Sequence, residues 1–179
     1  MAQDFVYPQN NEAQFVAMAR RLGIGELVFV YREAPPPLQV FEGVKVSHAV
    51  VIKDKPLPRM INLIDDAQKT RFASEHPMVW GLCGIERGQK DFLHHRGSGI
   101  NQVIAKMLAK NQKHYLLDFS LLLHAPQPER SRLMGRMAQN LCLCKKFGVA
   151  VHIASFARSP QGMRSTKDLQ ALLRLIQRL

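Results

Sequence analysis

The chain has 179 residues, 46% of them apolar, which is enough for a single domain over residues 1–179 with a core of its own. No apolar run approaches the roughly 18 to 20 residues that cross a bilayer, so the sequence excludes a membrane-spanning helix. Three cysteines in no CxxC pattern favour a reducing, cytoplasmic setting over export. The net charge of +11 makes a polyanionic partner the first expectation.

The positive charge is concentrated in one half of the chain. Residues 1–86 contain nine basic and ten acidic side chains, a net of −1, whereas residues 87–179 contain sixteen basic and four acidic side chains, a net of +12. An excess of this size attracts a nucleic acid through counterion release. The alternative is a solvated basic surface that serves solubility alone.

The first half of the chain predicts an opening strand–helix–strand unit. A helix follows Asn11, buries apolar residues spaced three and four apart, and ends at Gly23. The continuous apolar run after it is typical of a strand buried on both faces of a parallel sheet. The predicted elements up to residue 85 are strands over 4–7, 27–31, 40–52 and 78–85 and helices over 12–22 and 60–73.

The clearest predicted helix spans Gly99–Asn111, with Ser98 as its cap. Its predicted buried face contains Ile100, Val103, Ile104, Met107 and Leu108. Lys106 and Lys110 lie on the opposite face, one turn apart, where like charges repel unless an anion lies over them. This face is therefore a candidate phosphate-binding surface.

The rest of the chain continues the alternation of strands and helices. A strand over 115–120 precedes a long helix from Pro128 to Phe147, which Gly148 ends. A strand over 149–154 and a helix over 167–179 follow, and Ser165 and Asp168 have the spacing of a capping box. The order predicts an α/β fold with a mostly parallel sheet, curled into a TIM-barrel-like βα-repeat barrel.

A search for catalytic or metal-ligating residues finds no strong pattern. None of the seven histidines pairs as HxH or HxxxH, and the adjacent His94 and His95 face opposite ways on an extended chain. Cys142 and Cys144 lie about 200° apart around a helix and cannot chelate together. The carboxylates Asp65, Asp66, Asp91 and Asp118 need convergence that sequence proximity does not supply. We therefore predict no catalytic residue and no metal site.

The basic residues of the second half gather at loops and helix starts. Arg96, Gly97 and Gly99 lead into a predicted helix N-terminus, where free amides and the helix dipole hold a phosphate or simply form a capped turn. The whole set comprises Lys90, Arg96, Lys106, Lys110, Lys113, Arg130, Arg132, Arg158, Arg164 and Lys167.

At this point the sequence resembles a known family. The segment from His94 to Lys106, HHRGSGINQVIAK, is similar to the basic loop and following helix of ribonuclease P protein component 3, the archaeal and eukaryal p30-type subunit. The DFS of residues 118–120 resembles the family's GFS strand, and Glu129-Arg130 opens a long helix as in the family. Arg164 and Lys167-Asp168-Leu169 resemble its basic turn and next helix start. The resemblance covers about residues 78–179.

The resemblance implies a barrel related to the polymerase-and-histidinol-phosphatase (PHP) hydrolases but without their metal-binding histidines. Family members bind a catalytic RNA, pair with ribonuclease P protein component 2, and support 5′ leader removal from precursor tRNA, which they meet indirectly. It implies no cofactor on the protein, Mg²⁺ on the RNA, and no catalysis by this chain alone. Because family members continue for several tens of residues beyond the position of Leu179, we expect a barrel incomplete at its C-terminus.

Charge pattern and resemblance together predict the RNA-binding residues. Position 95 is histidine where the family more often has arginine. The predicted contacts are His95, Arg96, Lys106, Lys110, Arg130, Arg158, Arg164 and Lys167. Two other hypotheses remain: a metal-dependent phosphoesterase of the PHP barrel type, and an assembly scaffold without RNA contact.

Overall fold

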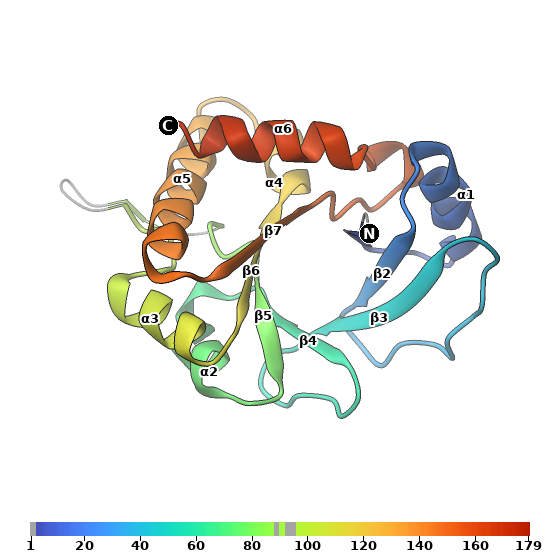
Figure 1. Cartoon of the computed structure of the whole chain (residues 1–179), viewed down its shortest axis with the longest axis horizontal. Helices are drawn as coiled ribbons and strands as arrows, with labels where there is room; N and C mark the ends of the chain where they lie inside the picture. Colours follow the sequence, from blue (N-terminus) through green and yellow to red (C-terminus); the bar gives the residue numbers. More distant parts are fainter. Residues whose placement is uncertain (1–2, 88–89, 92–95) are drawn as a thin grey trace.

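The computed structural model describes residues 3–87, 90–91 and 96–179 and forms a parallel barrel, seen end-on in Figure 1. Strands pair in chain order, each parallel to the next, as a TIM-like barrel requires. The strands are β1 (Gln3–Val6), β2 (Glu26–Tyr31), β3 (Lys45–Val51), β4 (Ile61–Ile64), β5 (Val79–Cys83), β6 (His114–Asp118) and β7 (Ala150–Ala154). The predicted fold class is confirmed.

The barrel nearly closes where the chain beyond β7 meets β1. The amide of Phe156 donates to the Phe5 carbonyl and that of Tyr7 to the Ala157 carbonyl, both at 2.8 Å. Asp4, which is buried, accepts hydrogen bonds from the backbone amide and the hydroxyl of Ser155, both at 2.6 Å. Burial raises the pKa of Asp4 to about 6. Backbone and side-chain hydrogen bonds therefore join the two edges of the sheet at this end.

The interior of the barrel is filled by the inward-facing side chains of alternate strand positions. Phe5 stacks on Phe156 with ring centroids 5.8 Å apart, and Val28, Val51 and Leu116 pack in the same cluster. Such a barrel is a packed core and not a pore.

One aromatic group lies at the end of the barrel where the strands begin. Trp80 stacks on His114 with ring centroids 3.9 Å apart and planes 9° apart, and His114 Nδ1 lies 3.0 Å from His152 Nε2. Burial lowers the pKa of both histidines. The lowered pKa favours the neutral form of each ring, and which of the two facing nitrogens donates depends on the tautomers.

Helices cover most of the outside of the barrel (Figure 1). The α-helices are α1 (Glu12–Leu22), α2 (Thr70–Glu75), α3 (Gln102–Lys110), α4 (Phe119–His124), α5 (Glu129–Phe147) and α6 (Thr166–Ile176), with short 3-10 helices at Ala67–Lys69 and Pro160–Gly162. Gly148 ends α5 with φ 74°, and Ser165 caps α6 through the Asp168 amide at 3.2 Å, as the sequence predicts. The connections into β3 and β4, which the structure describes in full, contain no helix.

Two predictions from the first half are wrong. Residues 60–73, predicted as one helix, contain β4, a 3-10 turn and α2. The run from Ile61 to Ile64 is a short strand between two neighbours, and a run of this length fits helix and strand equally well. The predicted strand over 40–52 is shortened to β3, and α4 was not predicted.

The predicted helix over 99–111 begins later, at Gln102. Gly99 has φ 88°, which no helix accepts, and the side chain of Asn101 caps α3 by accepting the Ile104 amide at 2.9 Å. The later start turns Val103 outward, where it is 64% exposed, while Ile104 and Leu108 are buried. The prediction of a buried Val103 is wrong.

Candidate nucleic-acid interface

The segment that follows β5 is fixed to α5 by a buried polar network. Glu86 is buried, and its Oε1 accepts hydrogen bonds from the Tyr115 hydroxyl and, at 2.7 Å, from Asn140 Nδ2. Asn140 Nδ2 also donates to the Ser98 carbonyl at 2.8 Å. Burial raises the pKa of Glu86. Because a buried network keeps its partners only in one arrangement, it sets the position of the segment on the helix.

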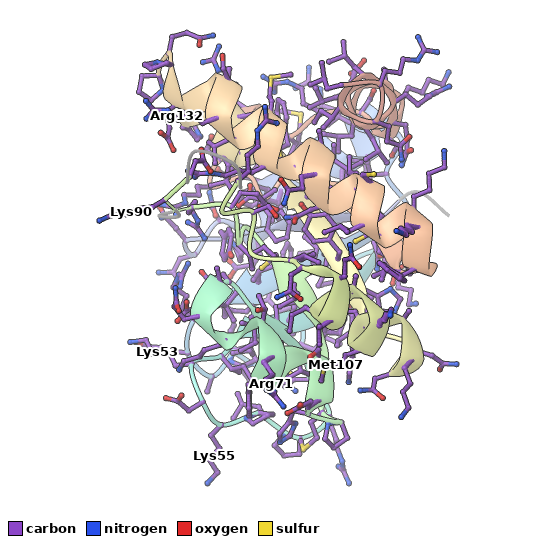
Figure 2. The ribbon with its side chains drawn as sticks, turned by 90° about the vertical axis from the view of Figure 1, so that its left-hand side faces the viewer. Lys53, Lys55, Arg71, Lys90, Met107 and Arg132 are labelled. Atoms are coloured by element: carbon purple, nitrogen blue, oxygen red, sulfur yellow. The ribbon has the colours of Figure 1, made fainter. Side chains whose placement is uncertain are left out.

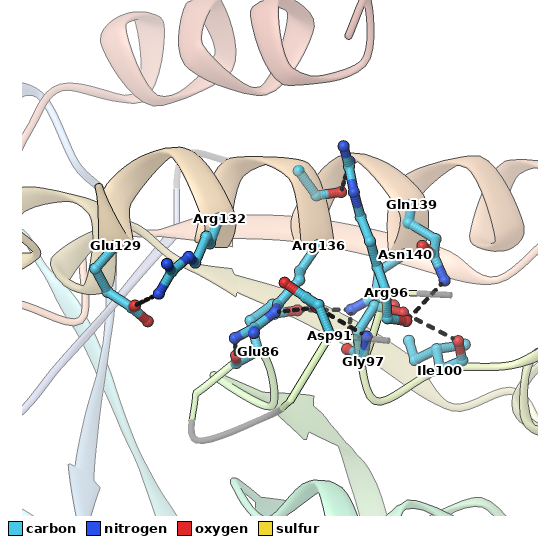
Figure 3. Close-up of polar contacts among 12 residues, drawn as sticks. Glu86, Asp91, Arg96, Gly97, Ile100, Glu129, Arg132, Arg136, Gln139 and Asn140 are labelled. Atoms are coloured by element: carbon cyan, nitrogen blue, oxygen red, sulfur yellow. Dashed lines mark hydrogen bonds and ion pairs between the residues drawn. The ribbon is translucent and has the colours of Figure 1, made fainter. Parts of the chain in front are cut away.

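Arg136 extends this network toward the surface (Figure 3). Its NH1 donates to the Glu86 carbonyl at 2.9 Å and its Nε to Asp91 Oδ1 at 3.0 Å. The same Asp91 oxygen accepts the Gly97 amide at 3.0 Å. These hydrogen bonds, that from Arg136 first, lower the pKa of Asp91. Arg136 therefore stabilises the fold, and its charge is matched.

Arg96 crosses α5 from this segment. Its NH1 donates to the Gly135 carbonyl at 3.1 Å, and Gln139 Nε2 donates to the Arg96 carbonyl at 3.4 Å (Figure 3). A Cβ at position 135 would lie 2.5 Å from Arg96 NH1, so only glycine allows this approach. The exposed guanidinium is thus held against the helix backbone and not left to move in solvent.

Two lysines meet further along α5, at its last turn. Lys106 of α3 and Lys146 of α5 place their ammonium groups 5.6 and 5.5 Å from the Phe147 ring centroid. Each gains a cation–π interaction, but the two like charges share one ring. Lys110 lies one turn after Lys106 and is exposed, as is Lys145. A bound anion would relieve the repulsion that this arrangement maintains.

These side chains form one surface, which we call the α3–α5 patch. No described residue of α3 is acidic, and Glu129 is the only acidic residue of α5, at the opposite end of the helix from Lys146. All members of the patch are exposed, and none forms an ion pair within the described ranges. The members are Arg96, Lys106, Lys110, Lys145 and Lys146.

The start of α3 holds its own hydrogen-bond partners. The Gly97 amide donates a hydrogen bond to Asp91, and the Ser98 amide donates to the Arg96 carbonyl at 3.0 Å. The Ile104 amide donates to the side chain of Asn101. These amides, which a phosphate would need, are therefore largely occupied by groups of the chain itself. This arrangement corresponds to the capped turn, the second of the two interpretations of this segment.

The other predicted RNA contacts lie at the carboxyl end of the barrel. Arg158 is exposed, 6.0 Å over the Tyr7 ring, and Arg164 is half-buried, 5.6 Å over Phe119. Arg130 is half-buried and donates to the Ala125 carbonyl at 2.9 Å, while Lys167 is exposed in the first turn of α6. The structure thus divides the predicted set into two regions, and His95 lies outside the described residues.

Lys113 belongs to neither region. It is only 6% exposed, and its Nζ donates to the carbonyls of His76, Pro77 and Val79 at 2.9, 3.2 and 2.5 Å. Desolvation lowers its pKa. The prediction that Lys113 is one of the exposed cations of the second half is wrong, because the side chain turns inward and binds the carbonyls between α2 and β5.

Arginines bind the carboxylates at the carboxyl end of the barrel. Asp65 Oδ2 accepts Arg32 NH2 at 2.8 Å and Arg87 NH2 at 3.2 Å. Asp118 accepts the Ser120 hydroxyl at 2.6 Å, and burial raises its pKa to about 6. In the part of the chain that the structure describes, no three His, Cys, Asp or Glu side chains are grouped to hold a metal.

Sequence reasoning missed these arginines and the lysines at the end of α5. Arg32 and Arg87 are 33 and 22 residues from Asp65, so only the barrel topology brings them together. Lys145 and Lys146 did carry a signal, since they follow a long acid-free stretch of helix. Figure 2 shows Lys53 and Lys90 pointing outward at one edge of the barrel, the carboxyl end, and Arg132 near the start of α5 at the same edge.

None of the described helices is both long and apolar enough to span a membrane. No family model matches the chain. It is 27% identical to ribonuclease P protein component 3 of Methanosarcina barkeri over 92% of this chain and 74% of that protein. The namesake from Methanosarcina acetivorans is 29% identical over 76% of this chain, which spans only 60% of that relative's length.

Ribonuclease P protein component 3 from Methanocaldococcus jannaschii is 34% identical over 51% of this chain and 37% of that relative's length. The fold matches a chain in the cryo-EM structure of archaeal ribonuclease P with mature tRNA, with a TM-score of 0.78, 23% identity, and coverage of 98% of this chain and 82% of that one. The chain is therefore similar in sequence to ribonuclease P protein component 3 of several archaea, and similar in fold to a chain of archaeal ribonuclease P.

Proposed function

We propose that this chain is a protein subunit of ribonuclease P that binds the catalytic RNA and supports 5′ leader removal from precursor tRNA. The observation that carries the proposal is the α3–α5 patch, five exposed cations without a carboxylate partner among the described residues. Such a surface neutralises successive phosphates of an RNA backbone and gains free energy from the counterions released. The names of the relatives supply the identity of that RNA.

The predicted contacts at the carboxyl end, Arg130, Arg158, Arg164 and Lys167, together with His95, complete the proposed RNA surface. In this proposal the protein performs no chemistry itself, Mg²⁺ serves the RNA, and precursor tRNA is met indirectly. Ribonuclease P protein component 2 is the proposed protein partner, and the cytoplasm is the proposed setting. The phosphoesterase alternative has less support, because Asp65, its best-placed carboxylate, already binds two guanidinium groups.

The first experiment measures RNA affinity against salt for the full chain and for the triple variant Arg96→Gln, Lys106→Gln, Lys110→Gln. The parent should lose affinity steeply between about 50 and 200 mM salt. The variant should show a slope shallower by about three units, because each substitution leaves about one phosphate without its cation. Stability should change by no more than about 0.5 kcal/mol at each position.

A matched control replaces three exposed cations of the first half, Arg21, Lys55 and Arg59, by glutamine. It changes the net charge equally and should keep most of the slope. If both variants lost RNA affinity equally, the total charge of the protein, and not the α3–α5 patch, would account for binding. A reconstituted cleavage reaction with precursor tRNA, with and without the chain, then tests the subunit role, and cleavage by the chain alone after RNA removal would contradict it.

A further inference from the structure

A pocket of about 490 Å³ opens beside the end of the barrel, between α4 and the chain that follows β7. Its size lies within the range of small-ligand sites. The described residues of its wall include no Asp or Glu. They are Arg87, Ser120, Leu121, Leu123, His124, Ala157, Arg158, Ser159 and Gly162. The wall thus combines guanidinium, imidazole and hydroxyl groups with apolar sides.

The two arginines come from different strands and are differently held. Arg87 follows β5 and is oriented by the Gly84 carbonyl at 3.2 Å and by Asp65. Arg158 follows β7, rests on the Tyr7 ring, and forms no ion pair with any described residue. One guanidinium is therefore fixed in place while the other remains available to a ligand.

The charges around the pocket favour a single negative charge. Arg32 and Arg87 bind Asp65, Asp118 Oδ2 lies near Gly84 as does Arg87 NH2, and Arg158 lies over the Tyr7 ring. These three guanidinium groups and two carboxylates leave an excess of one positive charge. The Ser120 hydroxyl already donates to Asp118, so the donors that remain are Arg158, the Ser159 hydroxyl and the His124 ring. A phosphodiester carries one negative charge and accepts several hydrogen bonds, and arginine forks match its oxygens.

We propose that this pocket binds one phosphodiester group, with Arg158 as the main ligand and Arg87, Ser159 and His124 around it. The inference rests on the proposed function for the source of the phosphate, an RNA backbone. It adds a discrete pocket on the barrel end, separate from the α3–α5 patch, that receives a single phosphate and not a run of them.

The test uses NMR of the ¹⁵N-labelled full chain with three probes: the dinucleoside monophosphate UpU, inorganic phosphate, and uridine. UpU should shift the amide signals of residues 157–162, and uridine should not. Arg158→Gln should weaken UpU binding about tenfold, the effect of losing a charge-assisted hydrogen bond pair, and Arg158→Lys should recover part of it. Arg174→Gln, an exposed arginine of α6 outside the pocket, is the matched control.

Each result decides one point. Unmoved signals at residues 157–162 with both anions, or equal weakening by Arg158→Gln and Arg174→Gln, would overturn the pocket. Binding of inorganic phosphate without UpU would overturn the RNA source, because the pocket then takes a free anion. A parent chain that binds UpU here but no structured RNA at low salt would keep the pocket and contradict the proposed function.

Discussion

The α3–α5 patch and the carboxyl end of the barrel both gather cations, but they hold many of them differently. At the barrel end, Arg32 and Arg87 share Asp65, Lys69 pairs with Asp54, and Arg132 lies 3.8 Å from Glu129. On the patch, Lys106 and Lys146 have only an aromatic ring. A cation beside a carboxylate contributes little field at the distance of an approaching polyanion. Net charge in a sequence therefore overstates the charge that a partner meets.

The largest expected effect separates two lysines that are three residues apart. Lys113→Met removes a buried ammonium group that satisfies three carbonyls, so the free energy of unfolding should fall by about 2 to 3 kcal/mol. RNA affinity of the folded protein should not change. Lys110→Met should do the reverse, with stability within about 0.5 kcal/mol and weaker RNA binding. Thermal unfolding and RNA titration of both variants check the pair, and an RNA defect in folded Lys113→Met would break the comparison.

A smaller effect is expected from freeing the paired arginines. Asp65→Asn removes the carboxylate that Arg32 and Arg87 share and adds one unit of positive charge to the barrel end. RNA affinity at low salt should rise about two- to threefold, with a steeper salt slope, because roughly one further phosphate is neutralised.

Glu75→Gln is the matched control for Asp65→Asn, because it removes an equal charge from the exposed Arg71 pair on α2. Titrations of both variants at several salt concentrations decide the matter. An equal rise in both would mean that total charge, and not its pairing at the barrel end, governs affinity.

The smallest effect concerns position and not charge. Gly135→Ala places a methyl group where Arg96 now lies, so the guanidinium must move off α5 while the net charge stays the same. RNA affinity should fall a few-fold, and stability should stay level or rise by up to about 1 kcal/mol, because alanine favours a helix interior. Unchanged RNA binding in Gly135→Ala would show that the position of Arg96 on the helix has no role.

Sequence alone predicts the barrel, α5 and α6 because their signals are local: alternating apolar runs, Gly148 after α5, and Ser165 three residues before Asp168. The charged regions could be predicted only in part. Lys110 and Lys113 look equivalent in sequence, but Gln112 has φ 52° and turns the chain, so Lys113 enters the interior. The apolar periodicity of the sequence does not predict that turn. It also does not predict that Arg32, Arg87 and Asp65, which follow three different strands, come together.

The stacked Trp80 and His114 give the barrel a built-in fluorescent reporter. Trp80 is the only tryptophan of the chain, and its indole lies against the two histidines inside the barrel, on strands β5, β6 and β7. Its emission therefore follows the packing of three adjacent strands and the protonation of the rings beside it. The cations that we assign to RNA lie on the outer helices and at the opposite end of the barrel. A ligand titration monitored by tryptophan fluorescence therefore reports on the scaffold and not on contacts at those cations.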